Sequence, residues 1–254
     1  MPRTNWTRAE TLVAFALYCR LPFGRLHART PEIVAVARRL GRTPAAVAMK
    51  CCNLASLDET HQARGVRGLQ KASAVDREIW TEFQANPESV AYKAAAALAR
   101  IESRAILPAP DPELEHLEGR EKERVTRVRV NQYFFRDIIL TGYGEACAVC
   151  GLPIPQLLVA SHIVPWAVDT SLRMNPRNGL CLCGTHDLAF ERGFLRVHCD
   201  FSIHISVSDR FRPLPSVRDW LLRFDGDLIQ LPQRWRPDPD LLARKLSLLG
   251  GAGQ

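Results

Sequence analysis

The chain has 254 residues, of which 46% are hydrophobic and 24% charged, and it carries a formal net charge of +7. This length allows one large or two small domains with buried cores. We find neither an apolar run of about 18 residues nor an apolar signal sequence, so we expect no membrane span and a cytoplasmic location. The eight cysteines should then be reduced thiols or metal ligands rather than disulfides.

The positive charge is unevenly distributed along the chain. Residues 1–100 contain 15 Lys+Arg against 8 Asp+Glu, whereas residues 101–254 contain 19 of each. A basic region favours an acidic polymer such as DNA as the partner.

Residues 6–56 predict three helices. Thr7 and Glu10 have the spacing of a capping box at the start of the first. The second is expected to end at Gly41, and the third starts directly after it at Thr43. A helix, a short glycine-containing turn and another helix form the layout of a helix-turn-helix unit.

Further helices are expected within residues 76–101, so residues 1–102 should form a basic helical domain that binds DNA. Residues 103–124 combine three closely spaced prolines with a mixed charge run, which is typical of a linker with a solvated surface.

The second half of the chain predicts a different architecture. A helix from Arg127 to Tyr143 is followed by strands, a short helix that ends at Gly193, and a β-hairpin. The expected fold class is therefore α+β: a helical domain, then a ββα-metal domain with an added hairpin at 125–210. Residues 211–254 form a C-terminal extension in which the sequence shows no chemistry. The strands are expected at 156–161 and 179–182, the short helix at 185–192, and the hairpin at 194–197 and 202–207.

Three sequence motifs in this half carry the chemistry. They read ASHIVPW, NPRNGLCLC and THDLAFERG. Together they resemble the HNH endonucleases, and in particular a bacterial subfamily of restriction-type enzymes, over about residues 127–206. WTRAETL and nearby stretches of the N-terminal half are similar to a segment found upstream of such domains. The resemblance implies a ββα-metal fold, a Mg²⁺ or Mn²⁺ cofactor, and DNA cleavage that leaves a 5′-phosphate and a 3′-hydroxyl.

The resemblance also implies roles for particular residues. His162 would be the general base, because a neutral imidazole can take a proton from water near pH 7. Asn178 would hold the loop around that base. The common spacing of nine residues from Asn178 lands on Asp187, so we favour Asp187 as the ligand of the catalytic ion, with His186 as the competing choice.

One position departs from the family pattern. Many HNH sites have an acidic residue directly before the first histidine, where this chain has Ser161. The ion would then be held by few protein groups together with water and phosphate oxygens. Asp169 is a weaker candidate for a further ligand.

Four residues have the spacing of a structural zinc site: Cys147 and Cys150, then Cys183 and His186. Two pairs of ligands, each separated by two residues, suit tetrahedral Zn²⁺. The alternative is that these are small buried thiols without a metal. If His186 binds zinc, Asp187 must serve the catalytic ion.

Basic residues in both halves are candidates for contacts with DNA phosphates. The alternatives for the N-terminal domain are a basic face that is only solvated, or a protein partner. Trp166 is expected to pack under its loop rather than to stack on DNA. The candidates are Arg38, Arg39, Arg42 and Lys50, with Arg64, Arg67 and Lys71 nearby, then Arg129, Gln132 and Arg136 on one helix, and Arg173 and Arg177 beside the active loop.

The sequence therefore predicts a metal-dependent DNA endonuclease with a role in restriction or defence. Cutting both strands with one active site per chain would favour a homodimer. Two alternatives stay open: a zinc-containing nucleic-acid-binding protein without activity, and a nuclease specific for RNA or for modified DNA.

Overall fold

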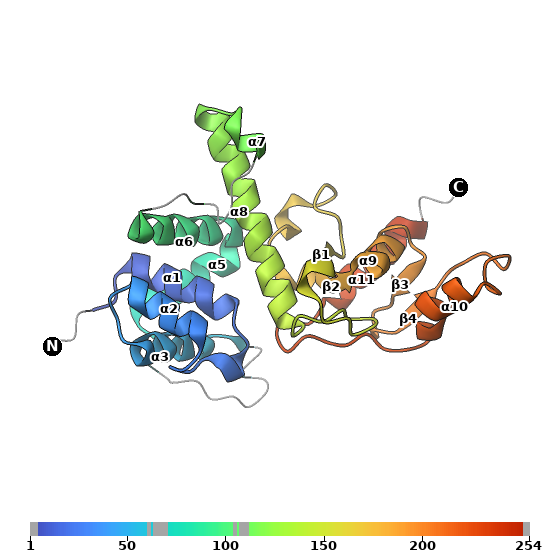
Figure 1. Ribbon diagram of the computed structural model, residues 1–254, viewed down its shortest axis with the longest axis horizontal. Helices are drawn as coiled ribbons and strands as arrows, with labels where there is room; N and C mark the ends of the chain where they lie inside the picture. The colour runs from blue at the N-terminus through green and yellow to red at the C-terminus, as the bar shows by residue number, and fades with distance from the viewer. Residues whose placement is uncertain (1–4, 60–61, 63–70, 104–105, 107–111, 251–254) are drawn as a thin grey trace. The chain divides into compact units, whose positions relative to one another are not determined.

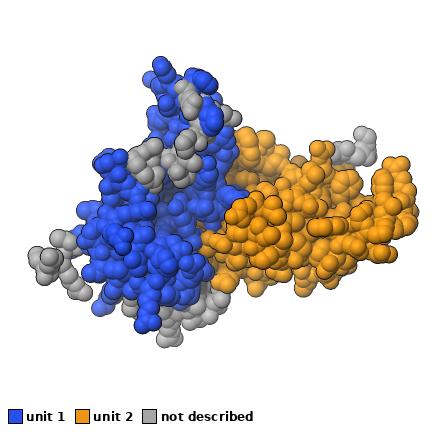
Figure 2. All heavy atoms as spheres, viewed as in Figure 1, with its two compact units in different colours: residues 1–137 blue, residues 138–254 orange. Residues whose placement is uncertain are grey.

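The computed structural model describes residues 5–59, 62, 71–103, 106 and 112–250. The chain divides into two compact units, residues 1–137 and 138–254 (Figure 2). Each unit has its own buried core. The predicted α+β class is confirmed, with helices in the first unit and small antiparallel strand pairs in the second (Figure 1). No helix in the described ranges has the length and apolar character needed to cross a membrane.

The first unit is built around helix α1. Its Phe15 and Tyr18 are fully buried, and the Phe15 ring lies 5.0 Å from Phe83 and 6.0 Å from Trp80. These aromatic contacts join α1 to α5, and α1 also packs against α2, α3 and α6. The helices are α1 (Arg8–Cys19), α2 (Pro31–Arg39), α3 (Pro44–Ala55), α5 (Ala74–Ala85), α6 (Pro87–Glu102) and α7 (Pro112–Glu115), with a short 3-10 turn η1 (Phe23–Arg25).

Local signals in the sequence set the boundaries of these helices. Thr7 and Glu10 form the predicted capping box at the start of α1. Gly41 adopts a φ of +62°, a left-handed conformation that glycine reaches without steric cost, and this residue turns the chain between α2 and α3. The side chain of Thr43 then caps α3 by accepting a hydrogen bond from the Ala46 N–H. The helix-turn-helix layout of this region is therefore present.

Helix α8 (Gly119–Gly142) begins within the segment expected to be a linker. Glutamate, lysine and arginine are good helix formers, so the charge run before Arg127 continues the helix toward the N-terminus. Its residues 119–124 are exposed, as expected for a solvated charge run. The division between the two compact units falls inside α8, at Asp137 and Ile138.

The second unit contains the predicted strand, loop, strand and helix. Strands β1 (Leu158–His162) and β2 (Gly179–Cys183) pair antiparallel, and His162 lies opposite Gly179. Helix α9 (Gly184–Glu191) follows β2 directly and packs against both strands and against β3. The added hairpin is present as β3 (Leu195–Val197) and β4 (Ile203–Ile205). The loops contain 3-10 turns at η2 (Pro155–Leu157), η3 (Thr170–Leu172) and η4 (Pro176–Asn178).

The C-terminal extension packs as part of this second unit. It contains α10 (Pro215–Trp220), η5 (Leu222–Phe224) and α11 (Pro239–Gly250). The Ile205 N–H donates to Asp225 Oδ1 at 2.8 Å, and the Gln230 N–H donates to the Ala148 carbonyl at 2.7 Å. Leu242 of α11 is fully buried. The extension therefore contributes to the same core as the strands and α9.

Candidate active site and metal centre

His162 is the last residue of β1 and is half-buried. Its Nε2 lies 3.0 Å from the carbonyl oxygen of Arg173. A carbonyl oxygen accepts hydrogen bonds, so Nε2 carries the proton of the neutral ring and Nδ1 is the nitrogen with a basic lone pair. Burial lowers the pKa of His162, and the Arg173 carbonyl and the charge of Glu191 oppose this shift only in part. The ring is therefore neutral near pH 7.

Asn178 is fully buried at the end of the loop that follows His162. Its Oδ1 accepts the Val164 N–H at 2.9 Å, and its Nδ2 donates to the Val164 carbonyl at 3.0 Å and to the Leu172 carbonyl at 3.3 Å. All of these bonds go to backbone groups. The side chain of Asn178 therefore joins the two ends of the loop and fixes the backbone next to His162.

Helix α9 carries three polar residues that matter for the site. His186 is buried, while the adjacent Asp187 is half-buried. Glu191 follows Asp187 by four residues, a spacing that places both carboxylates on the same face of the helix. The charge of Glu191 acts on the His162 ring and favours its protonated form. The sequence reasoning missed Glu191, although its four-residue spacing from Asp187 was a usable signal.

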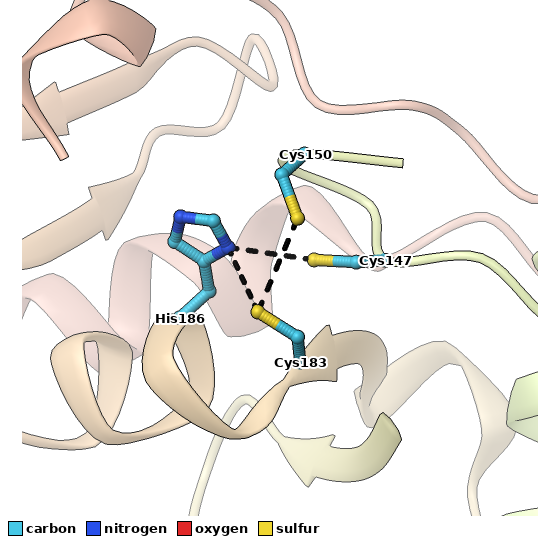
Figure 3. Close-up of side chains that lie close together, drawn as sticks. All are labelled: Cys147, Cys150, Cys183 and His186. Atoms are coloured by element: carbon cyan, nitrogen blue, oxygen red, sulfur yellow. Dashed lines mark hydrogen bonds between the residues drawn. The ribbon is translucent and has the colours of Figure 1, made fainter. Parts of the chain in front are cut away.

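The side chains of Cys147, Cys150, Cys183 and His186 converge on one point (Figure 3). Their ligand atoms all lie within 4.8 Å of one another. His186 Nδ1 lies 3.6 Å from Cys147 Sγ and 3.2 Å from Cys183 Sγ, and the sulfurs of Cys150 and Cys183 are 4.0 Å apart. Tetrahedral Zn²⁺ with ordinary bond lengths requires about 3.8 Å between sulfurs and about 3.5 Å between sulfur and nitrogen. The cluster fits such an ion.

The electrostatics of this cluster also favour a cation. Burial would raise the pKa of Cys147, but the His186 ring and backbone N–H groups lower it to about 6. Burial and the neighbouring thiols raise the pKa of Cys150 to about 12 and also raise that of Cys183. A bound cation would stabilise the negative charges of neighbouring thiolates, so all three cysteines could be deprotonated together.

The second nitrogen of His186 orients the ring toward the sulfurs. Its Nε2 lies 3.0 Å from the carbonyl oxygen of Trp220 in the C-terminal extension. Metal-binding histidines usually donate their other N–H to such an acceptor, which fixes the tautomer and the direction of the ring. The geometry therefore places His186 in the cysteine cluster, whereas the next residue, Asp187, is not part of that cluster.

Ser161 and Asp169, which lie before and after His162 in the chain, differ in their surroundings. Ser161 is buried, and its Oγ has no hydrogen-bond partner among the described residues. Both carboxylate oxygens of Asp169 are already engaged, one by Ser171 and the other by Arg244 at 2.8 Å. Asp169 is thus held as an ion-pair partner, and this does not favour it as a metal ligand.

Helix α9 carries two acidic side chains of the kind that suit a hard cation. Asp187 and Glu191 offer carboxylate oxygens, which Mg²⁺ and Mn²⁺ prefer. Within the described ranges, the cysteine cluster is the one group of three or more histidine, cysteine or acidic ligands gathered closely enough to hold an ion. An ion at the active site would therefore be bound by few protein groups, with the remaining positions left for water and substrate.

Helix α11 supports the motif residues from the C-terminal extension. Lys245 of this helix is 4% exposed, and its ammonium lies 4.8 Å from the centre of the Phe190 ring on α9. Asp238 and Arg244 form ion pairs with residues of the loop between β1 and β2, and Lys245 forms an ion pair with α9. The ion pairs are Asp238–Arg177 at 3.4 Å, Arg244–Asp169 at 2.8 Å and Lys245–Glu191 at 3.6 Å.

Two of the basic residues expected to contact DNA lie inside the first unit. Lys50 is 5% exposed and donates to the buried Asp76 at 2.8 Å. The Arg42 side chain is 13% exposed, and its Nε donates to Glu10 at 2.8 Å. Both cations also lie over the Trp6 ring. The expectation that Lys50 and Arg42 offer surface charge to phosphates is therefore corrected: they are internal ion pairs of the helical unit.

The other candidates of the first unit lie at its surface. Arg38 is exposed, and Arg39 pairs with Glu102 at 2.6 Å. Arg129, Gln132 and Arg136 lie on the part of α8 that belongs to this unit, and Arg129 Nη1 donates to Gln132 Oε1 at 3.3 Å, as expected for one helix face. Lys71 is exposed, whereas Arg64 and Arg67 lie outside the described residues.

The second unit thus contains a strand pair, a helix directly after it, and a histidine at the end of the first strand. In a comparison with protein families, residues 147–198 match the family described as HNH endonuclease. This segment is an HNH endonuclease domain. Comparisons with curated proteins and with solved structures gave no match.

Proposed function

We propose that this chain is a metal-dependent endonuclease that hydrolyses DNA phosphodiester bonds at its HNH domain. The observation that carries this proposal is the state of His162, together with the family match at residues 147–198. The ring is half-buried, its Nε2 is engaged by the Arg173 carbonyl, and its pKa is lowered. Such a ring presents a neutral Nδ1, which is the form that a general base needs.

The other residues of the site have complementary roles in this proposal. His162 accepts the proton of the attacking water at Nδ1. Asn178 keeps the loop backbone in place, so that the ring does not rotate away. Asp187 would hold one divalent cation, which would polarise the phosphate and stabilise the departing oxygen. The products would carry a 5′-phosphate and a 3′-hydroxyl.

The Cys147, Cys150, Cys183 and His186 cluster would hold a structural Zn²⁺. Four protein ligands close a tetrahedral site, which leaves no position for a substrate. This ion would connect the 147–150 turn to the start of α9 and so fix the helix that carries Asp187.

The biology that we propose is restriction or defence, with DNA as the partner. A homodimer would supply two active sites for cutting both strands. These points are supported by the sequence resemblance and by the basic N-terminal region.

Cleavage of a supercoiled plasmid in Mg²⁺ or Mn²⁺ tests the proposal directly. The wild-type protein should nick or linearise the plasmid, and a chelator should prevent this. His162→Ala should reduce the rate by about 10²–10⁴-fold, the usual contribution of a general base. His204→Ala is the matched control, because this exposed histidine of β4 pairs with Asp225. Cleavage that survives His162→Ala would overturn the assignment of the base.

The same assay distinguishes the alternatives when the substrate is varied. Unmodified, methylated and single-stranded DNA, together with RNA, form the panel. Cleavage restricted to methylated DNA or to RNA would favour a nuclease for those substrates. Zinc content with nucleic-acid binding but no cleavage of any substrate would favour a protein that binds without activity.

A further inference from the structure

Trp166 and Arg173 form a stacked pair at the surface of the loop between β1 and β2. The Trp166 side chain is 50% exposed, so it does not pack beneath the loop as expected from the sequence. The central carbon of the Arg173 guanidinium lies 4.6 Å from the centre of the Trp166 ring. This is a cation–π contact, which holds the long arginine side chain in one orientation.

The guanidinium of Arg173 has no other partner in the part of the chain that the structure describes. Its Nε is buried without a hydrogen bond. Two other arginines around the same loop differ: Arg177 pairs with Asp238, and Arg244 pairs with Asp169. Stacking uses the flat face of a guanidinium and leaves its in-plane N–H donors for another acceptor. Arg173 is thus a positive charge that no acid neutralises within the described residues.

The backbone of Arg173 connects this charge to the proposed catalytic base. The Arg173 carbonyl oxygen lies 3.0 Å from His162 Nε2. The preceding carbonyl, of Leu172, accepts a hydrogen bond from the Asn178 amide at 3.3 Å. The position of Arg173 is therefore fixed relative to the general base by two independent hydrogen bonds.

We infer that Arg173 binds a phosphate of the DNA strand that is being cut, and that Trp166 holds the guanidinium and offers its exposed face to a neighbouring base. This inference rests on the proposed function and specifies how the same site holds its substrate. A guanidinium binds phosphate through paired N–H donors. An exposed aromatic ring can stack on any nucleobase, so the pair would fix the strand without reading its sequence.

The test is a DNA-binding titration of the full chain with a fluorescently labelled duplex, without added Mg²⁺ or Mn²⁺. Affinity is measured at several salt concentrations for wild type, Arg173→Gln and Arg173→Ala. Loss of one phosphate contact should reduce the slope of log K against log salt by about 0.9. We expect affinity to fall about tenfold. Arg173→Gln keeps part of the aliphatic stem and so separates loss of charge from loss of packing.

Arg177→Ala is the matched control, because this arginine belongs to the same loop but is neutralised by Asp238. Its salt slope should stay close to that of wild type. Trp166→Ala should weaken binding through loss of stacking with little change in slope. Thermal unfolding and zinc content of each variant establish that it is folded.

The outcomes separate this inference from the proposed function. A wild-type protein that neither binds nor cuts DNA would end the proposed function. A wild-type protein that binds and cuts, with folded Arg173→Gln and Arg173→Ala variants of unchanged affinity and slope, would refute the phosphate contact alone. The phosphate contact would also be refuted if Arg177→Ala reduced the salt slope as much as the Arg173 variants do. The unpaired charge of Arg173 would then not distinguish it from the ion-paired Arg177.

Discussion

Two neighbouring residues of α9 have different surroundings, and in the proposed function they serve different sites. His186 is buried among three cysteines, and its second nitrogen is engaged by the Trp220 carbonyl. Asp187 is half-buried and belongs to the helix face that also carries Glu191. Successive residues of a helix point about 100° apart, so one short helix can contribute to two centres with different chemistry.

The two centres also differ in how completely the protein builds them. The cysteine cluster gathers four ligand atoms within 4.8 Å of one another. Around His162, the rigid part is the loop held by Asn178, and few side chains are available for an ion. A structural metal site is closed by protein ligands, whereas a catalytic site keeps positions open for water and substrate. Substitutions at the two centres should therefore have different consequences.

The largest effect is expected from Cys183→Ser. Loss of this ligand should remove the zinc and destabilise the whole second unit, because folding and structural zinc binding are coupled. Metal analysis and thermal unfolding should show less than one zinc per chain and a lower melting temperature. Cys199→Ser is the control, since this cysteine is exposed and lies outside the cluster. Full zinc content in Cys183→Ser would contradict the assignment.

Asp187→Asn should affect the other centre alone. Removing the negative charge weakens the ligand of the catalytic ion, and we expect cleavage to fall by about 10²-fold or more. Zinc content and melting temperature should remain those of wild type, in contrast to His186→Ala, which should lose zinc. Asp209→Asn is a control at an exposed acid. Loss of zinc in Asp187→Asn would show that the two centres are not separate.

Lys245→Met tests whether the C-terminal extension supports catalysis. The ammonium of Lys245 neutralises Glu191 from a buried position, and methionine keeps the packing against Phe190 without the charge. We expect kcat to fall about tenfold with little change in KM, and Lys245→Arg to restore most of the rate. Glu191 is partly exposed, so its unpaired carboxylate stays hydrated and the melting temperature should change little. An unchanged kcat would restrict α11 to a packing role.

The smallest effect is expected in the pH profile of Glu191→Gln. His162 works as a base only when neutral, so the rate falls as pH drops through its pKa. Burial lowers that pKa below the ordinary value of about 6.5, and the charge of Glu191 raises it in part. Removing this charge should move the acid limb of kcat to still lower pH. Measurements at saturating Mn²⁺ check the direction, and a shift to higher pH would contradict it.

Local features of this protein were predictable from the sequence. The capping box at Thr7 and Glu10, the turn at Gly41 and the end of α9 before Gly193 all depend on residues close in the chain. Gly193 adopts a φ of +75°, which explains why the helix stops there. The spacing of Cys147 with Cys150 and of Cys183 with His186 likewise indicated two pairs of possible ligands, because each pair lies on a single turn; that the two pairs meet is a property of the tertiary structure.

Contacts between distant segments were not predictable in this way. Lys50 and Arg42 looked like surface cations until their long-range partners Asp76 and Glu10 placed them in the interior. The linker predicted at residues 103–124 overlaps the start of α8 at Gly119, so the helix begins earlier than expected. The role of the C-terminal extension depends on ion pairs whose partners are far apart in the chain, such as Lys245 and Glu191.

The sequence by itself predicted the kind of site, because histidine, asparagine, aspartate and cysteine at fixed short spacings indicate a chemistry before the fold is known. Only the tertiary structure decided which of these residues lie together and which charged side chains are paired. His186 joins the cysteines because the Trp220 carbonyl, 34 residues away, holds its ring toward them. Arg173 has no acidic partner among the described residues, whereas Arg177 pairs with Asp238. The burial and ion pairing of a side chain depend on which distant segments of the chain meet in the fold. The spacing of residues along the sequence does not show which segments these are.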